Sequence, residues 1–189
     1  MLLFITLTSL LAWATPEVKT VDKVDLNQYL GLWNELYRIP NRFQDNSSES
    51  KSVCYDTTAE YTELPGGGIR VRNTCKRKID GVEKSEVAEA RGGVIENSAN
   101  AKLTVNFTGM AILRWVGIGN GNYWILGLGA VNKQNQYSWA LVGDPDRKYG
   151  WILAREKTLP AAELAKIFAI AEANGYEKAR FSLIQPPTH

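Results

Sequence analysis

From Leu32 onward, the chain is a succession of short runs rich in Val, Ile, Tyr, Trp and Thr, which alternate with clusters of Gly, Asn, Asp and Pro. Runs of this composition are typical of β-strands, and the clusters are typical of the turns between them. The connections at Pro65–Gly68 and Asp80–Gly81 are short enough to join antiparallel neighbours. The pattern predicts an all-β, eight-stranded antiparallel meander, with strands over residues 32–39, 53–63, 69–78, 84–92, 102–108, 123–129, 136–143 and 150–155.

Eight antiparallel strands can close into an up-and-down barrel, which encloses either packed side chains or one small ligand. The size of the inward-facing residues distinguishes these two interiors. Small residues recur on several strands of the face that we expect to point inward, namely Ala59, Ala88, Ala90, Ser138 and Ala140. A solid core requires larger groups at such positions, so the pattern favours a hollow interior that binds a ligand.

One α-helix is expected to start near Pro160, with Thr158 as a possible cap, and to end before Gly175. Its apolar residues fall at i, i+3, i+4 and i+7 and form a single stripe, which consists of Leu164, Ile167, Phe168 and Ala171. The first, seventh and eighth strands are apolar on both faces, so we expect the helix to cover them from outside. Their inward sets are then Trp33, Glu35 and Tyr37; Ser138, Ala140 and Val142; and Tyr149, Trp151 and Leu153.

The first 14 residues are mostly apolar and end in Ala12-Trp13-Ala14, a pattern that signal peptidase accepts. We expect residues 1–14 to be a removed signal peptide and residues 15–189 to form one barrel domain, soluble and either periplasmic or secreted. The residue directly after the expected cleavage point is Thr15 and not a cysteine, so a lipid-anchored form is not supported. The formal net charge of +2, with both signs interspersed, argues against a nucleic-acid partner.

The chain has two cysteines, Cys54 and Cys75. In an exported chain, a small even number of cysteines indicates a disulfide. Counting outward from the turn at residues 65–68 places the pair about two rungs out of register, so a bulge or a diagonal pairing is required. The alternative is a nucleophilic cysteine, for which His189 at the end of the chain is the only histidine base.

Trp33 near the start of the first strand and Arg155 at the end of the eighth are expected to meet at one end of the barrel, because the direction of the chain reverses at each turn. A guanidinium stacked on an indole contributes about 0.5–2 kcal/mol and can seal that end. Gly31, Trp33 and Arg155 are therefore predicted to be structural. The alternative is an ordinary core tryptophan and an unrelated surface arginine.

Four sequence blocks, in this order and spacing, resemble the lipocalins, in particular the group of bacterial lipocalins and apolipoprotein D. They are residues 29–35 (YLGLWNE), 58–61 (TAEY), 123–126 (YWIL) and 143–155 (GDPDRKYGWILAR), and a helix follows them. The resemblance covers nearly all of the expected mature chain. It implies a cup-shaped, non-enzymatic binding protein for lipophilic molecules, often fatty acids or lysophospholipids, and it places Trp151 in the pocket.

The residues expected to contact the ligand are those assigned to the inner face or to the mouth of the barrel. They are Glu35, Tyr37, Ala59, Tyr61, Val71, Asn73, Ala88, Ala90, Val105, Phe107, Trp115, Tyr123, Ile125, Ala140, Tyr149 and Trp151. Glu35 would enter an apolar interior, where a carboxylate requires a partner or takes up a proton. Tyr37, Tyr123 and Asn73 are candidate partners; other side chains or water near the base of the barrel, or the polar end of a ligand, are the alternatives.

Residues 109–121 depart from the group, which tends to have a shorter turn here, and they are too apolar for an ordinary solvated loop: they include Met110, Ile112, Leu113, Trp115, Val116 and Ile118. We expect them to cap the interior; contact with a membrane surface or another protomer is the alternative. The sequence has no Ser-His-Asp order, phosphate loop or metal-spaced cluster, so we expect no catalysis, metal or cofactor. A lipocalin-fold enzyme and an interaction module that uses residues 110–118 remain alternative functions.

Overall fold

The computed structural model describes residues 17–42, 44, 45, 53–107 and 121–184 of the chain. The predicted signal peptide at residues 1–14 and nearly all of the apolar segment 109–121 lie outside this range. Among the described residues, the helical elements are α1 (Leu26–Tyr29), α3 (Ala161–Ala173) and the 3-10 turn η1 (Lys178–Arg180). The strands are β1 (Gly31–Arg38), β2 (Tyr55–Glu63), β3 (Ile69–Ile79), β4 (Val82–Val94), β5 (Lys102–Phe107), β6 (Gly121–Leu128), β7 (Trp139–Gly143), β8 (Gly150–Ala154) and β9 (Ser182–Leu183).

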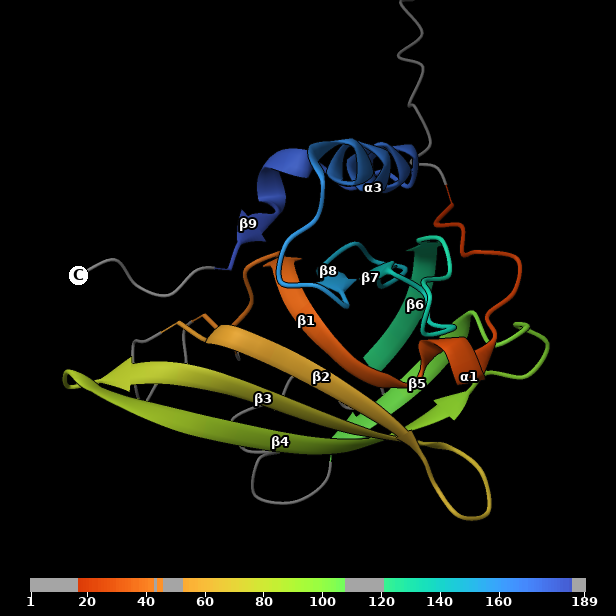
Figure 1. Ribbon diagram of the computed structural model, residues 1–189. Helices are drawn as coiled ribbons and strands as arrows, with labels where there is room; N and C mark the ends of the chain where they lie inside the picture. Colours follow the sequence, from red (N-terminus) through yellow and green to blue (C-terminus); the bar gives the residue numbers. More distant parts are fainter. Residues whose placement is uncertain (1–16, 43, 46–52, 108–120, 185–189) are drawn as a thin grey trace, which may run out of the picture.

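The first eight strands form a closed antiparallel barrel. Each of them pairs with its neighbours in sequence order, and β1 closes the sheet by pairing with both β8 and β2. The longest hairpin, β3–β4, keeps one register from Ile69↔Gly92 to Ile79↔Val82 around the turn at Asp80 and Gly81, and it extends away from the rest of the barrel in Figure 1. The eight-stranded up-and-down barrel predicted from the sequence is therefore confirmed.

The α3 helix lies outside the barrel, beside β7 and β8 (Figure 1). Its residues Ile167, Phe168 and Ala171 are buried in a cluster with outward side chains of β1, β7 and β8, and Leu164 packs against that cluster. The predicted apolar stripe and its place on the barrel are confirmed. The suggested cap is wrong, because the residue at the N-cap is Pro160, which has no side-chain hydrogen bond to the helix.

The apolar core has two layers, one on each side of the sheet. The inner layer includes Trp33, Ala140 and Leu153, whereas the outer layer includes Trp139 and Ile152. Adjacent residues of one strand therefore enter different layers, as the alternation of side chains along a strand requires. This arrangement is why β7 and β8 are apolar at nearly every position.

Two short elements complete the fold of the described residues. The one-turn helix α1 precedes β1 and is capped by the Asp25 carboxylate, which accepts a hydrogen bond from the backbone N–H of Asn27. Near the other end of the described chain, η1 leads into β9, which pairs with Tyr37 and Arg38 of β1. None of the helices in the described ranges has the length and apolarity needed to span a bilayer.

Candidate functional site

Most of the residues predicted to bind a ligand lie together on the inner face of the barrel. The buried members of the inner layer include Ala59, Tyr61, Val71, Ala88, Ala90, Val105, Ile125 and Ala140. Tyr123, Tyr149 and Trp151 pack against the same layer but remain partly exposed. Asn73 is also partly exposed and pairs with Ala59 and Ala88 in the sheet. The inner face is thus mainly apolar, with a few aromatic and polar groups that are not fully covered.

The prediction that Tyr37 faces the interior is wrong. Its ring packs edge-on against Phe168 of α3, with ring centroids 5.6 Å apart. The register between β1 and β8 shifts between Glu35 and Tyr37, so the strict alternation used for the prediction breaks at that point. As a result, Leu36 and Tyr37 both belong to the outer layer.

Two other predicted ligand residues cannot be placed completely. The backbone of Phe107 belongs to β5 and pairs with Ala90, but its side chain lies outside the described part of the structure. Trp115 also lies outside the described residues. Their contact with a ligand therefore stays a prediction.

The closed end of the barrel is sealed by Arg155 and Trp33. The guanidinium lies 3.6 Å from the centroid of the indole ring, as the sequence predicted. It also donates hydrogen bonds to several backbone carbonyls around α1 and the start of β1, those of Gln28, Tyr29, Leu30 and Leu32. Burial lowers the pKa of Arg155 to about 10, so the guanidinium remains charged at neutral pH.

Gly31 has a structural reason to be glycine. Its φ of +96° lies in a region that residues with a Cβ rarely adopt. A Cβ at this position would also lie 3.1 Å from Gln136 Nε2 and 3.4 Å from Arg155 Nη1. The glycine thus permits the sharp entry into β1 that places Trp33 beneath Arg155.

Three tyrosine hydroxyl groups meet in the interior near the closed end. The Tyr123 hydroxyl lies 2.6 Å from that of Tyr29 and 2.8 Å from that of Tyr61. Tyr29 comes from α1, Tyr61 from β2 and Tyr123 from β6, so the cluster joins three separate elements. Burial is the main cause that raises the pKa of each phenol, so all three hydroxyls stay protonated at neutral pH. We call these residues the tyrosine trio; Tyr29 was not among the predicted site residues.

The carboxylate of Glu35 is buried, and its partners differ from those predicted. Arg38 Nη1 donates to Glu35 Oε1 at 2.7 Å, and Gln44 Nε2 donates to both carboxylate oxygens, at 2.8 Å and 3.1 Å. Tyr123 belongs to the tyrosine trio instead, and Tyr37 faces outward. Burial raises the pKa of Glu35, and the charge and hydrogen bond of Arg38 lower it only in part.

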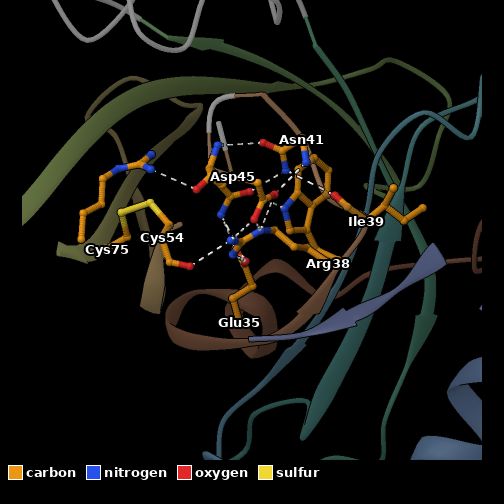
Figure 2. A network of polar contacts seen from close by, with 10 residues as sticks. Glu35, Arg38, Ile39, Asn41, Asp45, Cys54 and Cys75 are labelled. Carbon is orange, nitrogen blue, oxygen red and sulfur yellow. Dashed lines mark hydrogen bonds and ion pairs between the residues drawn. A yellow bond between two sulfur atoms is a disulfide. The ribbon is translucent and has the colours of Figure 1, made fainter. Parts of the chain in front are cut away.

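Figure 2 shows how this network reaches from β1 to the segment that follows it. Arg38 is fully buried and donates to both oxygens of Asp45 and to the carbonyl of Cys54. Gln44 accepts a hydrogen bond from the indole N–H of Trp151, at 3.1 Å. Gln44 is therefore inserted between Glu35 and an inward-facing residue of β8, which holds its segment against the inner wall.

The predicted disulfide between Cys54 and Cys75 is present, with the Cα atoms 5.5 Å apart. The register between β2 and β3 shifts between Tyr55 and Thr58, which confirms the predicted bulge. Asp56, inside the bulge, has a φ of +49°. The backbone N–H of Cys54 donates to the carbonyl of Gln44, at 2.7 Å, so the disulfide also anchors the segment that carries Gln44 to β3.

One group of potential metal ligands occurs in the described ranges, formed by Cys54, Cys75 and Glu86. Both sulfur atoms are in the disulfide, whereas metal binding by cysteine requires the thiolate. The chemistry of these donors therefore does not suit a metal ion.

Sequence reasoning missed Tyr29, Arg38 and Gln44. Alternation alone places Arg38 on the outer face of β1, and only the bulge turns it inward. Gln44 lies in an irregular segment whose course no periodic pattern predicts. For Tyr29, the useful signal is its position two residues before Gly31, at the end of the barrel that the sequence predicts to be closed.

Comparison with known proteins identifies a family and several relatives. The family model described as a lipocalin-like domain matches residues 24–186. Over 170 residues, the chain is 31% identical to the outer membrane lipoprotein Blc of Vibrio cholerae, which covers 89% of this chain and 86% of the relative. It is also 29% identical over 169 residues to temperature-induced lipocalin-1 of Arabidopsis thaliana, with 85% and 78% covered. Apolipoprotein D of Macaca fascicularis is 27% identical over 163 residues, with 86% and 77% covered.

Solved structures with the same fold have low sequence identity. The cockroach allergen Per a 4 superposes with a TM-score of 0.56 and 18% identity, over 89% of this chain and 93% of the allergen. Apocrustacyanin C1 superposes with a TM-score of 0.56 and 15% identity, over 87% and 81% of the two chains. At these identities, the likeness supports the barrel fold alone.

Proposed function

Because the chain belongs to the lipocalin-like family, whose members bind small hydrophobic ligands, we propose that it carries or stores one lipophilic molecule inside its barrel. The observation that carries this proposal is the composition of the inner layer. Buried alanines on the inner face, Ala88 and Ala90 on β4 and Ala59 on β2, stand where larger residues would fill the interior. Partly exposed aromatic groups, Tyr149 and Trp151, offer apolar surface to a ligand.

The ligand class we propose is a long-chain fatty acid or a lysophospholipid. Its tail would lie toward the closed end, at Trp33 and Arg155, and its head group at the opposite end of the barrel. An apolar wall supplies affinity in proportion to the tail that it covers. Burial of about ten methylenes at roughly 0.8 kcal/mol each gives on the order of 8 kcal/mol before ordering costs. A dissociation constant in the micromolar range is then expected.

Export of the protein is part of the proposal. The signal peptide predicted over residues 1–14 supports it, and so does the Cys54–Cys75 disulfide, because disulfides persist mainly in oxidising compartments. Blc of Vibrio cholerae, the relative with 31% identity, is named as an outer membrane lipoprotein. A location in the periplasm or outside the cell is consistent with these observations.

The test is calorimetric titration of the delipidated protein with fatty acids of increasing length. Affinity should rise with each added methylene until the tail fills the interior. Ala90→Trp places an indole on the inner wall and should weaken binding at least tenfold. Glu89→Trp is the matched control, because Glu89 is the neighbouring residue on β4 and its side chain is 58% exposed on the outer face.

The outcome that contradicts the proposal is specific. If Ala90→Trp keeps the circular dichroism of the folded protein and binds fatty acids with unchanged affinity, the ligand is not inside the barrel. The apolar segment at residues 110–118 would then be the leading site. Mass spectrometry of an organic extract of the purified protein adds an independent check, since a carrier should yield a co-purified lipid.

A further inference from the structure

The tyrosine trio has three hydroxyl donors, but only two hydrogen bonds join its members. Its three hydroxyl groups carry three protons, whereas the two short contacts between them use two. Within the described part of the chain, the three hydroxyls make no other hydrogen bond. One phenolic proton of the trio is therefore left to be donated to a group other than these three residues.

The buried position of the trio favours donation of this proton to a ligand in the interior. Tyr29 is fully buried and Tyr61 is 3% exposed, so the hydroxyls lie in an apolar environment. A buried donor that finds no acceptor is unfavourable, because its hydration is lost without replacement. Tyr123 is only partly buried, so the ligand that we propose would approach the trio at this residue.

Other polar groups occur on the wall beside the trio. Thr57 and Asn73 lie on the same pair of strands as Tyr61, farther from the closed end. The hydroxyl of Thr57 is buried without a hydrogen-bond partner within the described residues, and Asn73 is partly exposed. The inward residues of β7 and β8 beside Leu153 are apolar, namely Ala140 and Val142. The polar groups left to bind a ligand are thus on the β2–β3 side and at the closed end, whereas Glu35, Arg38 and Gln44 bond to one another.

We propose that the tyrosine trio is a ligand subsite that accepts an oxygen atom at the deep end of the bound molecule. This inference rests on the function proposed above and narrows the ligand class. The preferred ligand is a lipid whose buried end carries a hydroxyl or carbonyl oxygen, instead of a tail that ends in a methyl group. The ligand oxygen accepts the remaining phenolic proton, while the chain behind it contacts the apolar wall.

The experiment compares pairs of fatty acids of equal length, from 10 to 18 carbons, one with a terminal methyl group and one with a terminal hydroxyl. In a purely apolar pocket the hydroxyl weakens binding, because it loses water without gaining a partner. If the trio is a subsite, the hydroxylated acid of the length that reaches it should bind about three- to tenfold more tightly than the plain acid, as expected for one neutral hydrogen bond.

The variant that tests the assignment is Tyr61→Phe/Tyr123→Phe, which removes two hydroxyls and preserves both rings. It should abolish the preference for the hydroxylated acid, measured as the ratio of the two affinities within the same variant. Tyr176→Phe is the matched control. It also removes a buried phenolic hydroxyl, but one that bonds to the backbone of Asp144 in the outer layer, so the preference should persist.

Three outcomes would overturn the inference. The first is equal or weaker binding of every terminally hydroxylated acid, which is expected if ordered water already takes the proton. The second is a preference that survives in the double variant. The third is a preference confined to the shortest hydroxylated acids, whose terminal oxygen would reach Asn73 or Thr57 and not the trio. In each case plain acids would still bind and still be blocked by Ala90→Trp, whereas failure of the proposed function removes binding of both acids.

Discussion

Replacement of Arg155 by Ala should destabilise the barrel without removing its capacity to bind a ligand. The guanidinium covers the ring of Trp33, which is fully buried, and bonds to backbone carbonyls of α1 and β1. Loss of the stacking contact costs about 1 kcal/mol. The carbonyls that lose a charged donor add about 1–2 kcal/mol, a modest sum because water can reach some of them.

The expected total is about 2–3 kcal/mol, which corresponds to a decrease in Tm of roughly 5–10 °C for a domain of this size. Urea unfolding followed by tryptophan emission and by far-ultraviolet circular dichroism measures the free energy of unfolding. Arg155→Lys should recover less than half of the loss, because an ammonium group lacks the planar fork and the stacking surface. Arg91→Ala is the control, since Arg91 is exposed on β4.

Three results would refute this reasoning. Equal stability of Arg155→Ala and Arg91→Ala would show that the contacts at the closed end contribute nothing measurable. Unchanged stability together with lost fatty-acid binding would instead make Arg155 part of the ligand site. Full recovery of stability by Arg155→Lys would show that the positive charge alone accounts for the loss, and that stacking on Trp33 contributes nothing.

Three further predictions concern the opposite end of the barrel and the entry into β1. Reduction of the Cys54–Cys75 bond, whose sulfurs are separated by 21 residues of sequence, should lower the free energy of unfolding by about 3 kcal/mol in urea titrations; an unchanged midpoint in reductant contradicts this. For Glu35→Gln, burial raises the pKa of the native carboxyl above 4.5. The contribution of Glu35 to stability is therefore full below about pH 4.5 and is lost as pH rises through the raised pKa. The stability of the wild type relative to this variant should decrease over that range in urea titrations at stepped pH, and an increase would show that Arg38 outweighs burial. Gly31→Ala should cost about 1–2 kcal/mol because of its positive φ; thermal unfolding with no shift would contradict this.

The strands and their order could be predicted because alternation and turn residues are local signals. The prediction for the closed end also succeeded, since the meander brings the start of β1 and the end of β8 together whatever the details of packing. The inner face followed from parity, which holds as long as each strand alternates regularly. For Ala59, Ala88 and Ala90, it does.

The assignment of inward and outward residues by strict alternation was wrong where the register between β1 and β8 shifts. The bulge between Glu35 and Tyr37 moves Tyr37 to the outer layer and turns Arg38 inward. This change cannot be read from the residues themselves, because a bulge depends on how two strands that are distant in sequence pair with each other. The same reason explains why the partners proposed for Glu35 were wrong.

The sequence by itself determined the class of the fold, the closure of one end and which strands line the interior, because hydrophobic periodicity and turn chemistry act over a few neighbouring residues. Tertiary structure alone decided which polar groups meet inside. Tyr29, Tyr61 and Tyr123 come from α1, β2 and β6, and Gln44 reaches Glu35 from an irregular segment. These hydrogen bonds require distant parts of the chain to be positioned to within a few tenths of an ångström. That precision is reached only when the whole barrel closes and packs.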